Sequence, residues 1–132
     1  MKFSFKNDYS EGCHPKILEA LSQYNLDQQN GYGLDIYSEN AANIIREKSK
    51  SPESKVHLVS GGTQANLIVI SSILRPHESV VSANTGHIFT NETGAIEATG
   101  HKVHGVETKD GKLRPEDIQK VLDVHTNVPH QL

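Results

Sequence analysis

The chain has 132 residues, of which 35% are hydrophobic, 5% aromatic and 22% charged, so it can form one domain with a modest core. A net charge of −3 and the lack of any lysine or arginine run argue against a nucleic-acid partner. Cys13 is the single cysteine, which excludes an internal disulfide, and no apolar stretch is long enough for a signal peptide or a bilayer span. We therefore expect a cytoplasmic protein with no membrane partner.

The first part of the sequence predicts two helices joined by a loop. Pro15 and the apolar spacing that follows it predict a helix over about 15–24. Residues 25–33 are polar and contain glycine, which favours a loop. A second helix is expected from near Ser38 to Lys48.

The rest of the chain alternates between strand and helix patterns. Strands are expected at 56–59, 79–82 and 102–106, where β-branched residues gather. Helices are expected over about 63–74, 90–98 and 115–122. Gly100 should stop the second of these helices, and Thr63 or a neighbour should cap the first.

This alternation predicts an α/β fold with a parallel sheet covered on both faces and right-handed crossovers. Three strands make a narrow sheet, and parallel sheets are normally buried. The sequence ends just after the last predicted helix, where a further strand would be expected. We therefore expect the chain to be the front part of a larger domain.

A glycine-containing turn lies between the first predicted strand and its helix. Residues 60–66 read Ser-Gly-Gly-Thr-Gln-Ala-Asn, and they should leave several backbone N–H groups at the helix N-terminus without partners. Such a turn, with the Thr63 hydroxyl, can bind a phosphate. It lacks the Gly-Lys-Ser/Thr and Gly-x-Gly-x-x-Gly patterns of nucleotide-binding loops. The alternative is an ordinary turn in which glycine serves the geometry alone.

Two further polar residues follow the second predicted strand. His87 and Glu92 should lie beyond its carboxyl end, where ligands bind in open α/β sheets. His87 could stack on an aromatic ring or move protons, and Glu92 could serve as an acid or base. Alternatively, His87 only ends the strand and Glu92 favours a helix N-terminus. The pair His101 and His104 lacks further ligands, so no metal site is expected.

Taken in order along the chain, these motifs resemble the threonine aldolase and β-eliminating lyase family. The matching stretches are Phe5-Lys6-Asn7-Asp8, Pro15-x-Ile17-Leu18-x-Ala20-Leu21, Gly31-Tyr32-Gly33-x-Asp35, Gly62-Thr63-x-Ala65-Asn66, His87-Ile88 and Glu92-x-Gly94-Ala95. The resemblance covers essentially the whole sequence, and it is carried by the order of the motifs rather than by any one of them.

The resemblance implies an α/β fold, namely the N-terminal part of the large domain of a fold-type I pyridoxal-phosphate enzyme. That domain has three α/β/α layers, here with a truncated and mostly parallel sheet. Residues 1–35 would form an N-terminal helix and interface loop, and residues 36–132 a partial cofactor-binding domain. The family also implies a homodimer or homotetramer whose active sites lie between subunits.

The resemblance further assigns residues to pyridoxal 5′-phosphate. Gly61, Gly62 and Thr63 would hold the cofactor phosphate through backbone N–H groups and the threonine hydroxyl. His87 would stack on the pyridine ring. No lysine in the sequence has the family's Schiff-base context, so the covalent anchor is expected to lie outside these residues.

Catalytic and substrate roles are implied by the same matches. His87 and Glu92 are the candidates for acid–base work close to the substrate. Asn7 would contact the substrate carboxylate, and Tyr32 would belong to the loop at the subunit boundary.

The predicted reaction is the aldol cleavage of a threonine-like β-hydroxy-α-amino acid to glycine and an aldehyde. One alternative is β-elimination from an aromatic or sulfur-containing amino acid, and another is a fragment that binds phosphate without chemistry. With the lysine missing, these residues alone are expected to be inactive.

Overall fold

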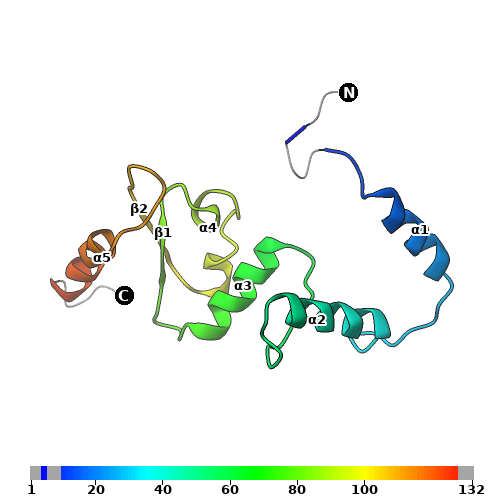
Figure 1. Ribbon diagram of the computed structural model, residues 1–132. Coiled ribbons are helices and arrows are strands. Elements are labelled where there is room, and N and C mark those ends of the chain that lie inside the picture. The colour runs from blue at the N-terminus through cyan, green and yellow to red at the C-terminus, as the bar shows by residue number, and fades with distance from the viewer. Residues whose placement is uncertain (1–3, 6–9, 128–132) are drawn as a thin grey trace. The chain divides into compact units, whose positions relative to one another are not determined.

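The computed structural model describes residues 4–5 and 10–127 of the chain (Figure 1). The chain forms two compact units, residues 1–58 and residues 59–132. None of the helices in the described part combines the length and the apolar character needed to cross a bilayer.

The first unit contains two helices, α1 (Pro15–Tyr24) and α2 (Ile36–Lys48). Pro15 opens α1 as predicted, and the ring of His14 accepts a hydrogen bond from the Lys16 N–H at 3.2 Å. The N-cap of α2 is Asp35, whose carboxylate accepts bonds from the backbone N–H and the hydroxyl of Ser38, both at 2.7 Å. This cap places the start of α2 two residues before the predicted position.

The loop between the two helices is held by aromatic and polar contacts. The rings of Tyr24 and Tyr37 lie 5.2 Å apart, and the Tyr37 hydroxyl bonds to the carboxylate of Asp27. That hydrogen bond is the main reason why the pKa of Tyr37 is raised to about 12. The loop over 25–33 is thus confirmed.

The second unit carries the sheet. It contains α3 (Gly62–Ile73), β1 (Val80–Ala83), α4 (His87–Thr90), the 3₁₀ turn η2 (Glu97–Thr99), β2 (Val103–Val106) and α5 (Pro115–Asn127). Strands β1 and β2 pair in parallel, with Val80 opposite Val103 and Ala83 opposite Val106. Helix α4 contacts both strands, and α5 contacts β2. The parallel pairing confirms the predicted parallel sheet, which in the described residues has two strands rather than the three expected.

Two predicted elements are wrong. Residues 56–59 form no strand, because no strand in the described part of the chain pairs with them. The helix expected over 90–98 is also absent: α4 ends at Thr90, and only η2 follows. The backbone turns left-handed at Thr93 (φ 50°) and Gly94 (φ 78°), which breaks any continuous helix. Gly100 ends η2 in the left-handed conformation, as a glycine stop should.

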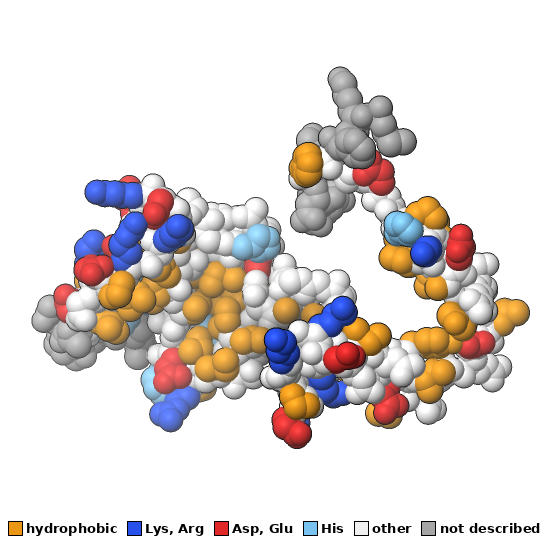
Figure 2. Space-filling view, viewed as in Figure 1, with side chains coloured by type: hydrophobic (Ala, Val, Ile, Leu, Met, Phe, Trp, Pro, Cys, Tyr) orange, Lys and Arg blue, Asp and Glu red, His pale blue; other side chains and the backbone are white. Residues whose placement is uncertain are grey.

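Little apolar surface is buried. Ile96, Ala83 and Val103 are the buried hydrophobic residues in the described ranges, together with the polar residues Ser82, Glu92 and His101. Many large apolar side chains remain exposed on both units, as the orange patches in Figure 2 show. The small core around β1 and β2 positions the candidate site described next.

Candidate functional site

The glycine turn opens α3 without a side-chain cap. Gly61 is the N-cap residue, two positions before Thr63, and no side-chain hydrogen bond caps the helix. The first backbone bond of the helix runs from the Ala65 N–H to the Gly61 carbonyl at 3.1 Å. The N–H groups of the three residues before Ala65 therefore lie at the positive end of the helix.

A side chain on α3 holds the turn in place. The Gln64 amide oxygen accepts from the Ser60 backbone N–H at 2.8 Å and from the Ser60 hydroxyl at 2.7 Å. A Cβ atom added at Gly61 or Gly62 would meet no atom within 4 Å, so the space beside both glycines is open. The turn thus combines backbone N–H donors in fixed positions with open space beside them, and this combination suits a bound phosphate.

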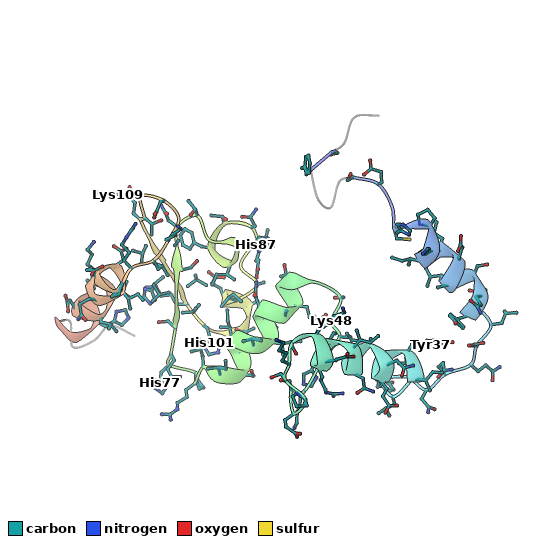
Figure 3. The ribbon with its side chains drawn as sticks, viewed as in Figure 1. Tyr37, Lys48, His77, His87, His101 and Lys109 are labelled. Carbon is teal, nitrogen blue, oxygen red and sulfur yellow. The ribbon has the colours of Figure 1, made fainter. Side chains whose placement is uncertain are left out.

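The second part of the site follows β1. The chain turns sharply after Ala83, and a Cβ at Gly86 would lie 2.2 Å from the Ser82 hydroxyl, so only glycine fits there. His87 then begins α4, and its side chain is 64% exposed. Figure 3 shows His87 in the second unit, at the start of α4.

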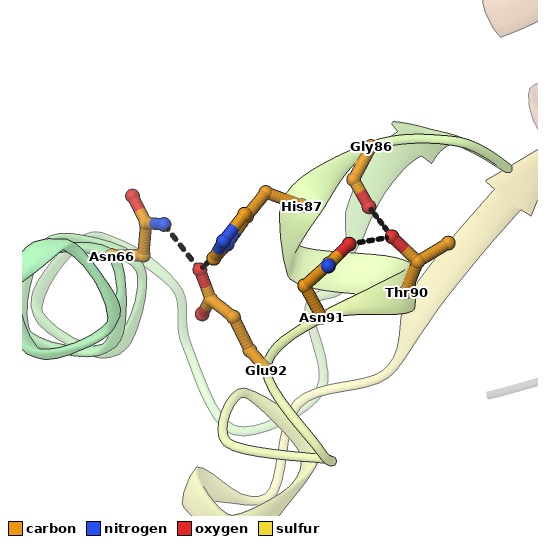
Figure 4. Close-up of polar contacts among 6 residues, drawn as sticks. All are labelled: Asn66, Gly86, His87, Thr90, Asn91 and Glu92. Carbon is orange, nitrogen blue, oxygen red and sulfur yellow. Dashed lines mark hydrogen bonds and ion pairs between the residues drawn. The ribbon is translucent and has the colours of Figure 1, made fainter. Parts of the chain in front are cut away.

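Glu92 connects these two parts. Its oxygen Oε1 lies 2.8 Å from His87 Nδ1 and accepts a hydrogen bond from Asn66 Nδ2 at 2.6 Å (Figure 4). Asn66 belongs to α3, so one carboxylate oxygen contacts both the glycine-turn helix and the histidine. We call these three residues the Glu92 cluster.

Two side chains of the Glu92 cluster differ strongly in their exposure to solvent. The Glu92 side chain is completely buried, whereas most of the His87 ring faces outward. The second carboxylate oxygen, Oε2, is buried and has no hydrogen-bond partner within the described ranges. A buried carboxylate of this kind is stabilised by the donors that reach it, here the amide and the imidazole.

The structure brings several predicted site residues into one unit. His87 and Glu92 are in direct contact, and Gly61, Gly62 and Thr63 start the helix that supplies Asn66 to the same cluster. Asn66 had no predicted role, although it is the last residue of the glycine-containing stretch 60–66.

The remaining predicted residues lie elsewhere. Tyr32 is in the first unit, where it is fully exposed and adopts a left-handed φ of 62°. It lines a cavity of about 820 Å³ together with Arg46 and His57. Asn7 lies outside the described residues. Within the described ranges, no group of three histidine, cysteine or acidic side chains is arranged to hold a metal ion.

Comparison with known proteins finds a matching family model and two relatives with a named activity. The family model described as beta-eliminating lyase matches residues 8–132. Two low specificity L-threonine aldolases, from a Pseudomonas species and from Pseudomonas aeruginosa, are 30% and 28% identical over 131 residues. Each comparison covers 95% of this chain and 38% of the relative.

A solved structure agrees in fold. The threonine aldolase of Leishmania major superposes with a TM-score of 0.85 at 51% identity, over 93% of this chain and 36% of that one. The present chain thus spans a little over a third of the length of these relatives, and it has the α/β fold of the N-terminal part of a fold-type I large domain. On the evidence of the family model and of these relatives, the chain belongs to the beta-eliminating lyase family.

Proposed function

We propose that the complete protein is a pyridoxal-phosphate-dependent lyase that cleaves a threonine-like β-hydroxy-α-amino acid into glycine and an aldehyde. The observation that carries this proposal is the 51% identity to a threonine aldolase over 93% of the chain. The two bacterial relatives with the same named activity support it.

The residues present suit the proposed cofactor. The open glycine turn, with the Thr63 hydroxyl, offers neutral donors at the positive end of a helix for the phosphate. His87 presents an exposed ring whose Nδ1 is tied to Glu92, and it is the residue proposed to lie against the pyridine. When bound, the cofactor supplies an electron sink for the α-carbon carbanion.

The protein's own share of the reaction is proton transfer and orientation. Cleavage breaks the Cα–Cβ bond, the β-hydroxyl loses its proton as the aldehyde forms, and the α-carbon gains a proton to give glycine. The outward Nε2 atom of His87 is proposed as the acceptor of the hydroxyl proton, either directly or through water. Glu92 is proposed to hold the ring, and Asn7 and Tyr32 to contact the substrate from the N-terminal segment and its loop.

Product analysis on the complete protein tests this function. Purified protein with pyridoxal phosphate is incubated with L-threonine, L-allo-threonine and phenylserine, and glycine and the matching aldehyde are quantified. Equimolar glycine and aldehyde are expected. Pyruvate and ammonia from tyrosine or cysteine conjugates, without glycine from any hydroxy amino acid, would instead establish β-elimination. Phosphate binding with no turnover would establish a non-catalytic module.

The family relationship also leads us to propose that the complete protein is a cytoplasmic homodimer or homotetramer. The exposed apolar side chains of the first unit support an assembled state, because such surfaces normally find a partner. Sedimentation of the complete protein would give its subunit number directly.

A further inference from the structure

The Glu92 cluster contains one donor that the proposed chemistry does not use. Asn66 Nδ2 lies 2.6 Å from Glu92 Oε1, the same oxygen that lies 2.8 Å from His87 Nδ1. Asn66 and Glu92 are 26 residues apart in the sequence, so this bond joins α3 to the segment after α4. In Figure 4 the dashed lines from the two side chains end on the same carboxylate oxygen.

This arrangement determines which nitrogen of His87 carries the hydrogen in the neutral ring. Asn66 directs its amide N–H to Glu92 Oε1, so that oxygen acts as a hydrogen-bond acceptor. The partner atom in His87 must then be a donor, which places the hydrogen on Nδ1 and leaves the lone pair on Nε2. Because the ring is largely exposed while the carboxylate is buried, the basic nitrogen is the one available to a ligand.

The carboxylate depends on Asn66 to stay in this orientation. Oε2 of Glu92 has no partner within the described part of the chain, so the amide and the imidazole are the two groups that hold the carboxylate there. Without the amide, the carboxylate can rotate and His87 loses a fixed acceptor. Both tautomers of the ring then become populated.

We propose that Asn66 is a positioning residue for His87. It acts through Glu92, holding Oε1 as the acceptor of the Nδ1–H bond so that Nε2 is the basic nitrogen of the neutral ring. Asn66 also lies on the helix that begins with the glycine turn, so it links that turn to the orientation of the histidine. The consequence for turnover rests on the proposed function, whereas the consequence for the tautomer does not.

The first experiment measures the tautomer directly. The complete protein is labelled with ¹⁵N-histidine, and His87 is assigned by its loss in His87→Gln. In the neutral ring of the wild-type protein the hydrogen is expected on Nδ1, whereas Asn66→Ala is expected to show a mixture of the two tautomers. Asn91→Ala is the matched control, because Asn91 is exposed and bonds to Thr90 outside the Glu92 cluster. It should retain the wild-type tautomer.

The second experiment measures coupling through Glu92. In the wild-type background, Asn66→Ala should lower kcat by about tenfold, as expected when a hydrogen bond to a charged group is lost. Its cofactor affinity should change by less than about threefold, because the glycine turn is intact. In a Glu92→Ala background the same substitution should have no further effect on kcat or on the tautomer.

Several outcomes would overturn the role of Asn66. A wild-type ring in the Nε2–H form would do so even if every variant failed to fold. An unchanged tautomer in folded Asn66→Ala would do so too, as would an undiminished effect of Asn66→Ala in the Glu92→Ala background. If the wild-type protein neither binds pyridoxal phosphate nor cleaves hydroxy amino acids, the proposed function fails. The tautomer measurement still decides the role of Asn66 in that case.

Discussion

Thr63 allows a test of the proposed phosphate site that keeps the shape of the side chain. It is exposed in the first turn of α3, and its hydroxyl would complement the backbone donors of that turn. Replacing Thr63 with valine removes the hydroxyl and keeps the shape. We expect pyridoxal phosphate to bind about tenfold more weakly, the loss of one hydrogen bond to a charged group, as measured by equilibrium dialysis.

Thr63→Ser is the matched variant, because it keeps the hydroxyl and loses only a methyl group. Its affinity should stay close to that of the wild-type protein. Equal affinity for Thr63→Val and the wild type would show that the Thr63 hydroxyl does not contact the phosphate, whatever the backbone of the turn does.

The closeness of His87 and Glu92 could be predicted from the sequence, whereas the hydrogen bond from Asn66 to Glu92 could not. Both acid–base candidates follow the end of β1 within nine residues, so their proximity follows from chain connectivity and from the sheet edge at which they lie. Asn66 reaches Glu92 only because α3 folds back beside the segment after α4. Local sequence does not specify such a tertiary contact.

At the scale of elements, local sequence patterns predicted helices that have a clear start signal. They failed where a strand needs a neighbouring strand or where the backbone adopts an unexpected conformation. Helix α1 has the predicted bounds because its proline start and apolar spacing are local signals. Residues 56–59 have a strand composition, but a strand also needs a paired neighbour, and none lies in the described ranges. The helix predicted over 90–98 failed because Thr93 and Gly94 adopt positive φ. Composition alone does not reveal that conformation at a threonine.

The packing of α4 on β2 requires glycine at position 105, because a side chain there would meet Phe89. A Cβ atom there would lie 2.5 Å from the Phe89 ring. We expect Gly105→Ala to destabilise the second unit by about 1–3 kcal/mol, the usual cost of overpacking. The intrinsic preference of a strand for alanine offsets only about 0.5–1 kcal/mol of this. Urea unfolding followed by amide signals of β1 and β2 measures the change.

The companion variants separate this clash from a general effect of alanine. Gly12→Ala should be nearly neutral, because a Cβ atom there would meet nothing within 4 Å. Adding Phe89→Leu to Gly105→Ala should recover part of the lost stability, because the smaller side chain leaves room. If the double variant recovers none of the lost stability, the proposed clash with Phe89 is wrong.

The docking of α5 on β2 should depend on pH through His104. The rings of His104 and His125 lie 4.9 Å apart, edge to face, and Nε2 of His104 is buried without a partner in the described part. Burial, followed by the charges of Lys102 and His125, lowers the pKa of His104 below its usual 6.5. The folded state therefore favours the neutral ring. The resulting stability is present above pH 6.5 and is lost as the pH falls through the folded pKa.

Thermal unfolding at a series of pH values checks this dependence. The melting temperature of the wild-type chain should fall as the pH is lowered from neutral through the range below 6.5, and His104→Gln should remove much of that fall. His77→Gln is the control, because His77 is exposed. A control that flattens the curve as much as His104→Gln would rule out the buried ring as the cause.

At the scale of the whole molecule, the balance of buried and exposed apolar surface is the dominant feature. Ile96 is the one large side chain in the described ranges that is fully buried, whereas α1 exposes Ile17, Leu18, Leu21 and Tyr24 by 45% or more. Their spacing places all four on one side of the helix. A face of this kind costs stability in water unless another surface covers it.

The proposed oligomer makes a quantitative prediction for this helix face. Replacing Leu18 and Leu21 with glutamine removes apolar area that association would bury, at about 1.5–3 kcal/mol for each fully buried leucine. Each substitution should therefore weaken subunit association by about tenfold or more, because 1.4 kcal/mol corresponds to a factor of ten. Sedimentation of the complete protein over a range of concentrations measures the dissociation constant.

Glu19→Gln is the matched control, since residue 19 lies on the opposite side of α1 from the leucines. It should leave the dissociation constant unchanged, and the helical circular dichroism of all three variants should match that of the wild type. If the leucine variants associate as tightly as the control, the apolar face of α1 lies outside the subunit interface. The contacts that cover it must then come from the same subunit, because a helix with four large apolar residues on one side is stable in water only when that side is packed.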